Sequence, residues 1–278
     1  MKNYSNKLMI AFVVASALTV SCSSDTSTMD TENEELIETE DENEEVSAST
    51  ELHAAFAEFD EGETDIYLIN DGTSVTIETT GLPNHETYYW GSNHELYREE
   101  AGSFQGTPST INPDGTYTDM RGEAKTYDDS FTVSTSPSIA NTTTTTSMGL
   151  IGISVSGAAI YNDQEGSGSL DEAAVSLDWT GGHIGPDVYH YHLEPEAITN
   201  NDEKLVGILK DGFFIYGRKC NATGTYPSDL DSSGGHSSTT QHTTVAEYHY
   251  HIINEMYTTT SNGEVGYILF AGPYQGSL

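Results

Sequence analysis

Basic side chains are scarce in this sequence. Nine Lys and Arg residues stand against 44 Asp and Glu residues, which gives a formal net charge of −35 over 278 residues. A chain this acidic repels phosphate backbones and negatively charged lipid surfaces, which argues against both nucleic acid and anionic lipid as partners. The same charge suits a protein whose partners are cations.

Cysteine is scarce as well, because the chain has only Cys22 and Cys220. If Cys22 carries a lipid, Cys220 is the one remaining thiol and no intramolecular disulfide can form. Cys220 is then a buried inert side chain, a metal ligand or an exposed thiol, and the sequence leaves these three readings open.

The signatures of several enzyme classes are missing. The sequence has no G-x-S-x-G element, no phosphate-binding glycine loop and no dinucleotide-binding fingerprint. Nothing in the spacing of Ser, His and Asp singles out a catalytic triad, so enzymatic activity is left open. Long helical periodicities are also absent, whereas Gly, Thr, Ser and Tyr are abundant. This composition predicts a mainly β fold with long Gly-rich loops and few short helices.

The first 22 residues predict a lipoprotein signal peptide that ends in a lipobox. Two lysines precede the apolar run Leu8–Val20, which is too short to span a membrane. The run stops at LTVSCSSD, where a small residue precedes Cys22, although Leu18 lies one position further from the cysteine than usual. Acyl chains on Cys22 would hold the protein on a membrane without a spanning helix. The alternative is an ordinary secretory signal.

Residues 23–50 predict a disordered acidic tether. They hold eleven Asp and Glu residues, no Lys or Arg, and almost nothing apolar, so they cannot bury enough surface to offset the entropy of ordering. Acidic residues just after a lipoprotein cysteine resemble the surface-export signals of some Gram-negative lipoproteins, and a solvated spacer is the alternative. We therefore expect an outer-membrane lipoprotein on the periplasmic or cell-surface face.

An internal repeat occupies the second half of the chain. LIGISVSGAAIYN (150–162) aligns without a gap with LVGILKDGFFIYG (205–217), and LDWTGGH (177–183) matches LDSSGGH (230–236). Each GGH then leads to a YHYH tetrad. This order predicts a duplicated β-rich unit whose copies pack about a pseudo-twofold axis. Such an axis either brings the two tetrads together or holds them apart.

The tetrads present their histidines in pairs. Residues i and i+2 of a strand share a face, so each tetrad projects two imidazoles to one side and two tyrosines to the other. Imidazole is a ligand for zinc, copper, iron and nickel, and the GGH histidine of each copy could complete a three-ligand set. The predicted metal ligands are His183, His190, His192, His236, His249 and His251.

Other polar residues near the motifs are weaker candidates. Asp178 and Asp231 lie five residues before the GGH histidines and are predicted as carboxylate ligands or as acceptors that fix an imidazole tautomer. His85 is a more distant candidate. The segment 163–171, which includes Glu165, follows the spacing of a calcium-binding EF-hand for nine positions but has Ala174 where that loop needs a glutamate. We interpret it as a Gly/Ser loop.

These blocks together resemble the bacterial YHYH-domain family, whose members carry a GVPIYN-like strand, a GGH, a YHYH, a DGFPIYG strand and a second GH…YHYH. The resemblance covers about residues 149–255. In this chain SGAAIYN replaces NGVPIYN, Phe214 replaces the proline of DGFPIYG, and the cysteines often found near the GGH blocks are missing. GLPNH (81–85) resembles an upstream GIPDH element. The family is known mainly by its sequence, so the resemblance implies no particular activity, substrate or fold.

The sequence thus predicts a β-rich N-terminal part of the domain at 51–148 and a duplicated YHYH domain at 149–278. Our hypothesis is a membrane-anchored extracytoplasmic lipoprotein that binds a transition metal, copper or zinc, with iron as a further candidate. The first alternative is a surface module that binds an extracellular glycan or mediates adhesion, in which buried His and Tyr side chains only form a hydrogen-bonded network. A metal-free hydrolase that uses a His/Asp pair is a third class.

Overall fold

The computed structural model describes residues 51–90, 93–99, 130–166, 168–170, 176–185, 188–259 and 265–278. All of them belong to one unit, Val46–Leu278. The predicted signal peptide, lipobox and tether lie outside the described residues. Within the described part of the chain, no helix has the length and apolar character needed to cross a bilayer.

Short strands make up most of the regular structure, so the prediction of a mainly β fold is confirmed. The elements before the repeat are η1 (Ala54–Glu58), β1 (Thr64–Ile69), η2 (Asn70–Gly72), β2 (Ser74–Thr79), β3 (Phe131–Ser134) and β4 (Ile139–Thr144). The first half of the repeat region contains β5 (Gly152–Ser154), β6 (Ala159–Ile160), β7 (Gln164–Glu165), β8 (Gly168–Ser169), β9 (Gly182–Ile184) and β10 (Tyr189–Tyr191). The remaining strands are β11 (Leu205–Leu209), β12 (Phe214–Tyr216), β13 (Gly235–Ser238), β14 (Glu247–His251), β15 (Met256–Thr259), β16 (Val265–Tyr267) and β17 (Tyr274–Gly276). The helical elements named among the described residues, η1 and η2, are short 3-10 turns.

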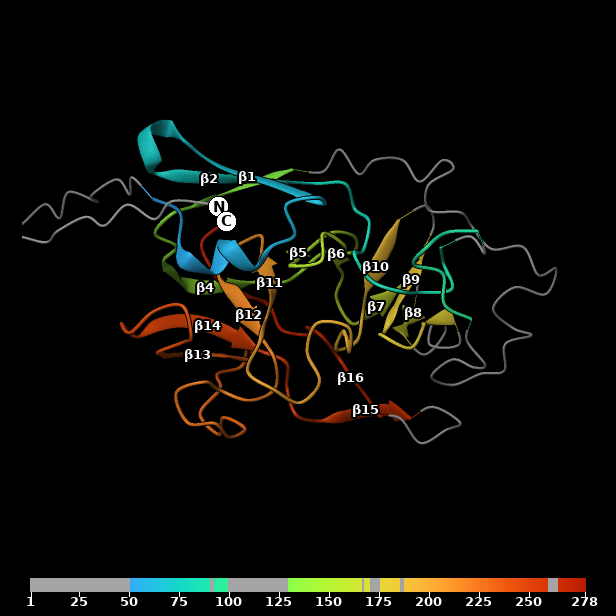
Figure 1. The fold of residues 1–278 in the computed structure, drawn as a ribbon. Coiled ribbons are helices and arrows are strands. Elements are labelled where there is room, and N and C mark those ends of the chain that lie inside the picture. The colour runs from blue at the N-terminus through green and yellow to red at the C-terminus, as the bar shows by residue number, and fades with distance from the viewer. Residues whose placement is uncertain are drawn as a thin grey trace, which may run out of the picture. The chain divides into compact units, whose positions relative to one another are not determined.

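Eight strands form the central sheet in the order β13-β14-β12-β11-β5-β6-β10-β9 (Figure 1). β5 and β11 pair antiparallel at its centre. Outward from this pair, both halves continue with an antiparallel pairing, then a parallel one, then an antiparallel one. The two halves therefore share the same order and directions, as copies of one unit would. That they arose by duplication stays a prediction.

The strand order decides where the two tetrads lie. β10 and β14 carry them, and each pairs in parallel with the second strand of its half. This pairing places the tetrad strands near opposite ends of the sheet, with β12, β11, β5 and β6 between them. The sequence left open whether the tetrads meet, and the structure holds them apart.

Glycine shapes the sheet at its hairpins and at its centre. Gly157 and Gly212 have φ values of +90° and +88°, which glycine adopts without steric cost, and they close the predicted turns of β5–β6 and β11–β12. At the central pairing, a Cβ on Gly207 would lie 2.3 Å from the carbonyl oxygen of Ile153. Glycine at this position therefore lets the backbones of β5 and β11, and so the two halves of the sheet, approach closely.

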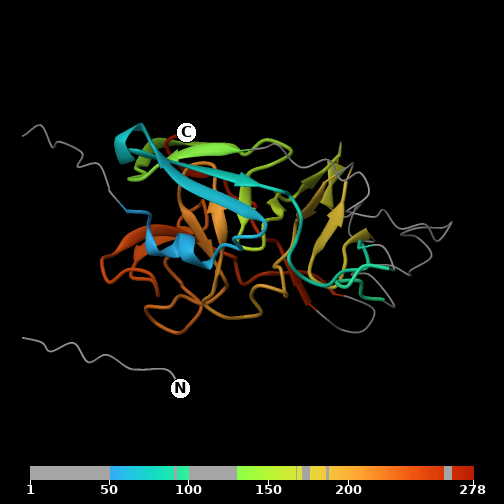
Figure 2. The ribbon, with the colours of Figure 1, turned by 45° about the horizontal axis from the view of Figure 1, so that its top comes forward.

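The two faces of the central sheet differ in chemistry. The tetrad tyrosines, including Tyr189 and Tyr250, belong to a large aromatic core cluster on one face. On the other face, Ile153 and Ile208 of the central strands pack against Val75 and other residues of the three-stranded sheet β1-β2-β3. Figure 2 brings the strands of this small sheet forward. The tetrad histidines project to this second face, beyond the central strands that the small sheet contacts.

Candidate metal centres

A tight loop sets the first GGH histidine in place. Asp178 Oδ1 accepts hydrogen bonds from two backbone N–H groups of its own loop, both at 3.0 Å. Gly181 has a φ of +80°, and its carbonyl accepts the backbone N–H of His192 at 3.1 Å. Because the loop is tied to β10 in this way, it leads into β9 with His183 directly opposite His190.

The second GGH loop is built in the same way. Asp231 Oδ1 accepts two backbone N–H groups of its loop at 2.8 and 3.1 Å. Gly234 has a φ of +84°, and its carbonyl accepts the backbone N–H of His251 at 2.9 Å. This places His236 opposite His249. Each half of the sheet therefore assembles three imidazoles on one face.

The first cluster consists of Glu165, His183, His190 and His192. The Nε2 atom of His190 lies 3.0 Å from the Nε2 atoms of both His183 and His192. Glu165 Oε2 lies 3.1 Å from Nε2 of His192 and 3.5 Å from Nε2 of His183. A tetrahedral zinc site with nitrogen and oxygen ligands has neighbouring donor atoms about 3.3 Å apart. The four donor atoms therefore have the spacing of a metal coordination shell.

The other ring nitrogens fix where the protons lie. Nδ1 of His190 faces the carbonyl oxygen of Val188 at 2.9 Å, and Nδ1 of His192 faces that of Asn162 at 2.6 Å. A carbonyl can only accept, so both Nδ1 atoms carry the proton and both neutral rings have a bare lone pair on Nε2. Two lone pairs that face each other at 3.0 Å repel unless a proton or a metal ion lies between them.

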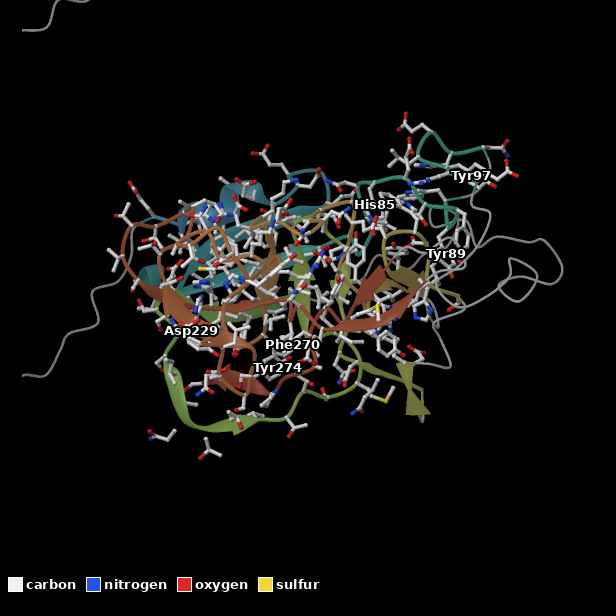
Figure 3. All side chains as sticks on the ribbon, turned by 90° about the horizontal axis from the view of Figure 1, so that it is seen from below. His85, Tyr89, Tyr97, Asp229, Phe270 and Tyr274 are labelled. Carbon is white, nitrogen blue, oxygen red and sulfur yellow. The ribbon has the colours of Figure 1, made fainter. Side chains whose placement is uncertain are left out.

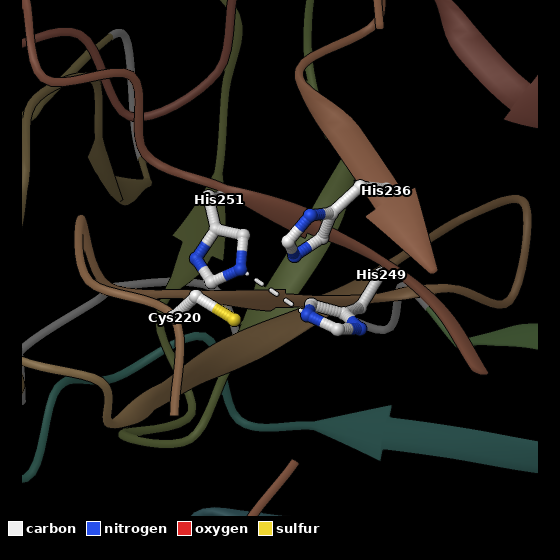
Figure 4. A group of neighbouring side chains, drawn as sticks. All are labelled: Cys220, His236, His249 and His251. Carbon is white, nitrogen blue, oxygen red and sulfur yellow. Dashed lines mark hydrogen bonds between the residues drawn. The ribbon is translucent and has the colours of Figure 1, made fainter. Parts of the chain in front are cut away.

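The second cluster consists of Cys220, His236, His249 and His251, whose donor atoms all lie within 4.8 Å of one another. Figure 4 shows the three rings and the sulfur turned toward a common space. Nε2 of His249 lies 3.1 Å from Nε2 of His251. The Ser238 hydroxyl lies 3.3 Å from both the Cys220 sulfur and Nε2 of His236.

The protons of the second cluster are fixed in the same way. Nδ1 of His249 donates to the Glu247 carbonyl at 3.0 Å, and Nδ1 of His251 donates to the Gly217 carbonyl at 2.7 Å. Nδ1 of His236 donates to the Asp229 carboxylate at 2.9 Å. The Nε2 atoms of His249 and His251 consequently present lone pairs to the cluster, and Nε2 of His236 faces the same space beside the Ser238 hydroxyl.

Burial disfavours a proton between the facing Nε2 atoms, because it disfavours the charged form of an imidazole. It lowers the pKa of His249 to about 4 and that of His251 to about 3. In the first cluster burial lowers the pKa of His190 well below its ordinary value, and the neighbouring imidazoles lower it further. Near neutral pH these rings are therefore uncharged. In contrast, His183, whose Nδ1 faces the Ser176 hydroxyl rather than a carbonyl, can carry its proton on Nε2, and its hydrogen bond lowers the pKa of Glu165 below the ordinary value.

The structure places the six predicted histidines in these two clusters, three in each. The predicted supporting residues lie elsewhere. Asp178 and Asp231 accept hydrogen bonds from the hydroxyls of Tyr189 and Tyr248, on the tyrosine face, at 2.7 and 2.9 Å. These carboxylates therefore hold the GGH loops in place. They do not act as the ligands or imidazole acceptors that the sequence predicted. Cys22 lies outside the described residues.

His85 also lies on the tyrosine face rather than in a cluster. Its Nε2 atom bonds to the Tyr191 hydroxyl, and its ring packs edge-on against Tyr189. Figure 3 labels His85 and Tyr89 near the first half of the sheet, and Asp229, the partner of His236, near the other half. The weak GLPNH element is therefore connected to the first tetrad through its tyrosines.

Sequence reasoning missed Glu165 as a cluster member, and it left Cys220 as one of three possibilities. A signal for both was present. The gap-free alignment of the repeat has an offset of 55 residues, and three positions beyond its last column the same offset sets Glu165 against Cys220. The last identical pair is Tyr161 with Tyr216, one column before the alignment ends, and a carboxylate and a thiol look unrelated until their places in space are known.

Comparisons with known proteins give one match. Residues 130–228 match a family model described as YHYH protein. The matched span includes the whole first cluster and Cys220, and it ends before the three histidines of the second cluster. Searches of curated proteins and of solved structures gave no significant match.

Proposed function

Because the chain carries a YHYH-protein domain, we propose that it is an extracytoplasmic protein that binds two transition-metal ions, one at each histidine cluster. One observation carries the proposal. In both clusters the Nε2 atoms of two tetrad histidines face each other at 3.0–3.1 Å while their Nδ1 protons are committed to backbone carbonyls. A metal ion between the lone pairs turns this repulsion into coordination.

The donor sets indicate which ions suit the clusters and what they do there. Three neutral imidazoles with one anionic ligand suit divalent zinc or copper, and iron is a further candidate. Four protein donors are typical of sites that hold their ion, whereas catalytic zinc sites keep one position for water. The geometry therefore supports retention of metal, in a structural or storage role, more than turnover of a substrate.

The direct test is metal analysis of protein purified without chelators, followed by titration of the metal-free protein with Zn²⁺. We expect about two equivalents per chain. His190→Gln and His249→Gln should each remove one of the two, and the double variant should remove both. His85→Gln, an imidazole substitution on the opposite face, is the matched control and should leave both sites intact. Less than about 0.1 equivalent in the native protein, with no uptake on titration, would overturn the proposal.

We propose in addition that a lipid on Cys22 anchors the protein at the outer membrane. The supporting observations are the apolar run, the small residue before Cys22 and the acidic segment that follows. The test is incorporation of a labelled fatty acid into the full-length chain. Cys22→Ser should lose the label and leave the membrane fraction, whereas Cys220→Ser should keep both properties. A Cys22→Ser variant that stays membrane-bound would contradict a lipid anchor.

A further inference from the structure

The two clusters differ at one ligand. Both contain the GGH histidine and the two tetrad histidines, but the fourth member is Glu165 in the first cluster and Cys220 in the second. These two residues occupy equivalent positions in the repeat, each four residues after the tyrosine of IYN or IYG. The halves of the sheet therefore offer the same three nitrogens with a different anionic ligand.

Glu165 reaches the first cluster from a hairpin. It ends β7, which pairs with β8 across a turn at Gly166, and 29% of its side chain is exposed. Its carboxylate oxygen Oε2 lies 3.1 Å from Nε2 of His192 and 3.5 Å from Nε2 of His183. Hard, oxygen-preferring ions accept such a ligand, and solvent can reach it.

Cys220 reaches the second cluster from a closed turn. Its backbone N–H donates to the Thr225 carbonyl at 2.9 Å, and its carbonyl accepts from Thr223 and Gly224 at 3.2 and 2.7 Å. Only 1% of the residue is exposed, so the sulfur is sheltered from oxidants in solution. A fixed, buried sulfur among three imidazoles is a ligand set for ions that bind thiolate well.

We propose that the two centres are chemically distinct, with the Cys220 centre selecting thiophilic ions such as Zn²⁺, Cd²⁺ and Cu⁺ by thiolate coordination and the Glu165 centre binding without sulfur. This inference rests on the proposed function, that each cluster binds a metal ion. Thiolate is a soft ligand and carboxylate a hard one, so one substitution between otherwise equal sets is enough to separate their preferences. The thiol proton is released to solvent when the metal–sulfur bond forms.

Cobalt(II) is a suitable probe, because it occupies tetrahedral zinc sites and gives an intense thiolate-to-metal charge-transfer band in the near ultraviolet. Titration of the full-length, metal-free protein should load both centres, and only one of them should develop the band. Cys220→Ser should abolish the band, whereas Glu165→Gln should leave it unchanged. Added Cd²⁺ should bleach the band at a lower concentration than it needs to displace the remaining cobalt.

A gain-of-function variant distinguishes the loss of a ligand from the loss of the fold. Glu165→Cys should double the charge-transfer intensity, because it gives the first centre the ligand set of the second. If two cobalt ions bind and the wild type shows no thiolate band, or if the band persists in Cys220→Ser, this inference is wrong while the proposed function stands. If no cobalt binds to any variant, the proposed function itself is wrong.

Discussion

The Tyr189 hydroxyl donates a hydrogen bond to Asp178 Oδ2 at 2.7 Å, on the opposite side of β10 from the His190 imidazole. The same carboxylate also accepts the two backbone N–H groups of the GGH loop on its other oxygen. One fully buried carboxylate therefore links the back of the tetrad strand to the loop that supplies His183. The YHYH pattern therefore has a physical reason for both of its residue types: its first tyrosine holds the GGH loop in place, and its histidines form the cluster of facing nitrogens.

This relationship predicts the effect of removing the hydroxyl. Tyr189→Phe leaves a buried carboxylate oxygen with one donor fewer, which should cost about 1–3 kcal/mol of unfolding free energy. Tyr226→Phe is the control, because that tyrosine is 42% exposed and its loss should cost no more than about 0.5 kcal/mol. The measurement is urea denaturation of the metal-free proteins. Equal stability of the two variants would contradict the role given to Asp178.

Asp229 should tune the affinity of the second centre. Its carboxylate accepts the Nδ1 proton of His236, which raises the basicity of the ligating nitrogen. Asp229→Ala should weaken metal binding at that centre by roughly 10–100-fold and leave the first centre unchanged. Competition with a chromophoric chelator measures both affinities. Asp65→Ala, an exposed carboxylate on β1, is the control for the loss of one negative charge; an equal effect there would show that net charge alone is responsible.

The centre of the sheet should not tolerate a side chain at Gly207. A Cβ there would lie 2.3 Å from the Ile153 carbonyl oxygen and 2.8 Å from the Ser154 Cα, both of them backbone atoms. Gly207→Ala should therefore destabilise the fold by about 1–3 kcal/mol. Thermal unfolding followed by circular dichroism tests this, with Val245→Ala at an exposed position as the control. A melting temperature equal to that of the control would mean that the two halves separate more easily than the structure indicates.

A buried ion pair beside the first tetrad should be essential for stability. Arg218 Nε donates to Glu194 Oε2 at 2.8 Å, and both side chains are less than 10% exposed. Arg218→Ala leaves Glu194 buried without its counter-ion and should cost about 3–5 kcal/mol. Replacing both residues, as Arg218→Met with Glu194→Leu, should recover most of that loss. Denaturant unfolding of the single and double variants decides the matter, and a double variant as unstable as Arg218→Ala would show that the charge is not the cause.

Much of the architecture could be predicted from local patterns. The i, i+2 rule placed His190 with His192 and His249 with His251, and glycine at 157 and 212 indicated hairpins that the structure confirms. These features depend on neighbours in the chain, so a sequence specifies them directly. The aspartates of LDxxGGH could not be assigned in the same way. Asp178 could have faced an imidazole or its own loop, and only the tertiary position of Tyr189 decides between them.

The separation of the two tetrads also could not be predicted from local sequence patterns. It follows from the parallel pairing of β10 with β6 and of β14 with β12, which is a choice between distant segments. Glu165 entered the first cluster for a similar reason. Its hairpin folds back toward β9 and β10, whereas the sequence of this segment predicts only a Gly/Ser loop.

Five strand spacings lie between β10 and β14 in the central sheet. At 4.7–4.9 Å each, this puts the tetrad strands about 24 Å apart along the sheet. With its anionic ligand each filled centre would carry a net charge of about +1, and two such charges about 24 Å apart interact by only about 0.7 kcal/mol at an effective dielectric constant of 20. Two dications bound at such a distance should neither repel nor assist each other appreciably, so filling would be non-cooperative and each centre would respond to the concentration of its own preferred ion. The molecule would then report on two separate pools of metal with one polypeptide.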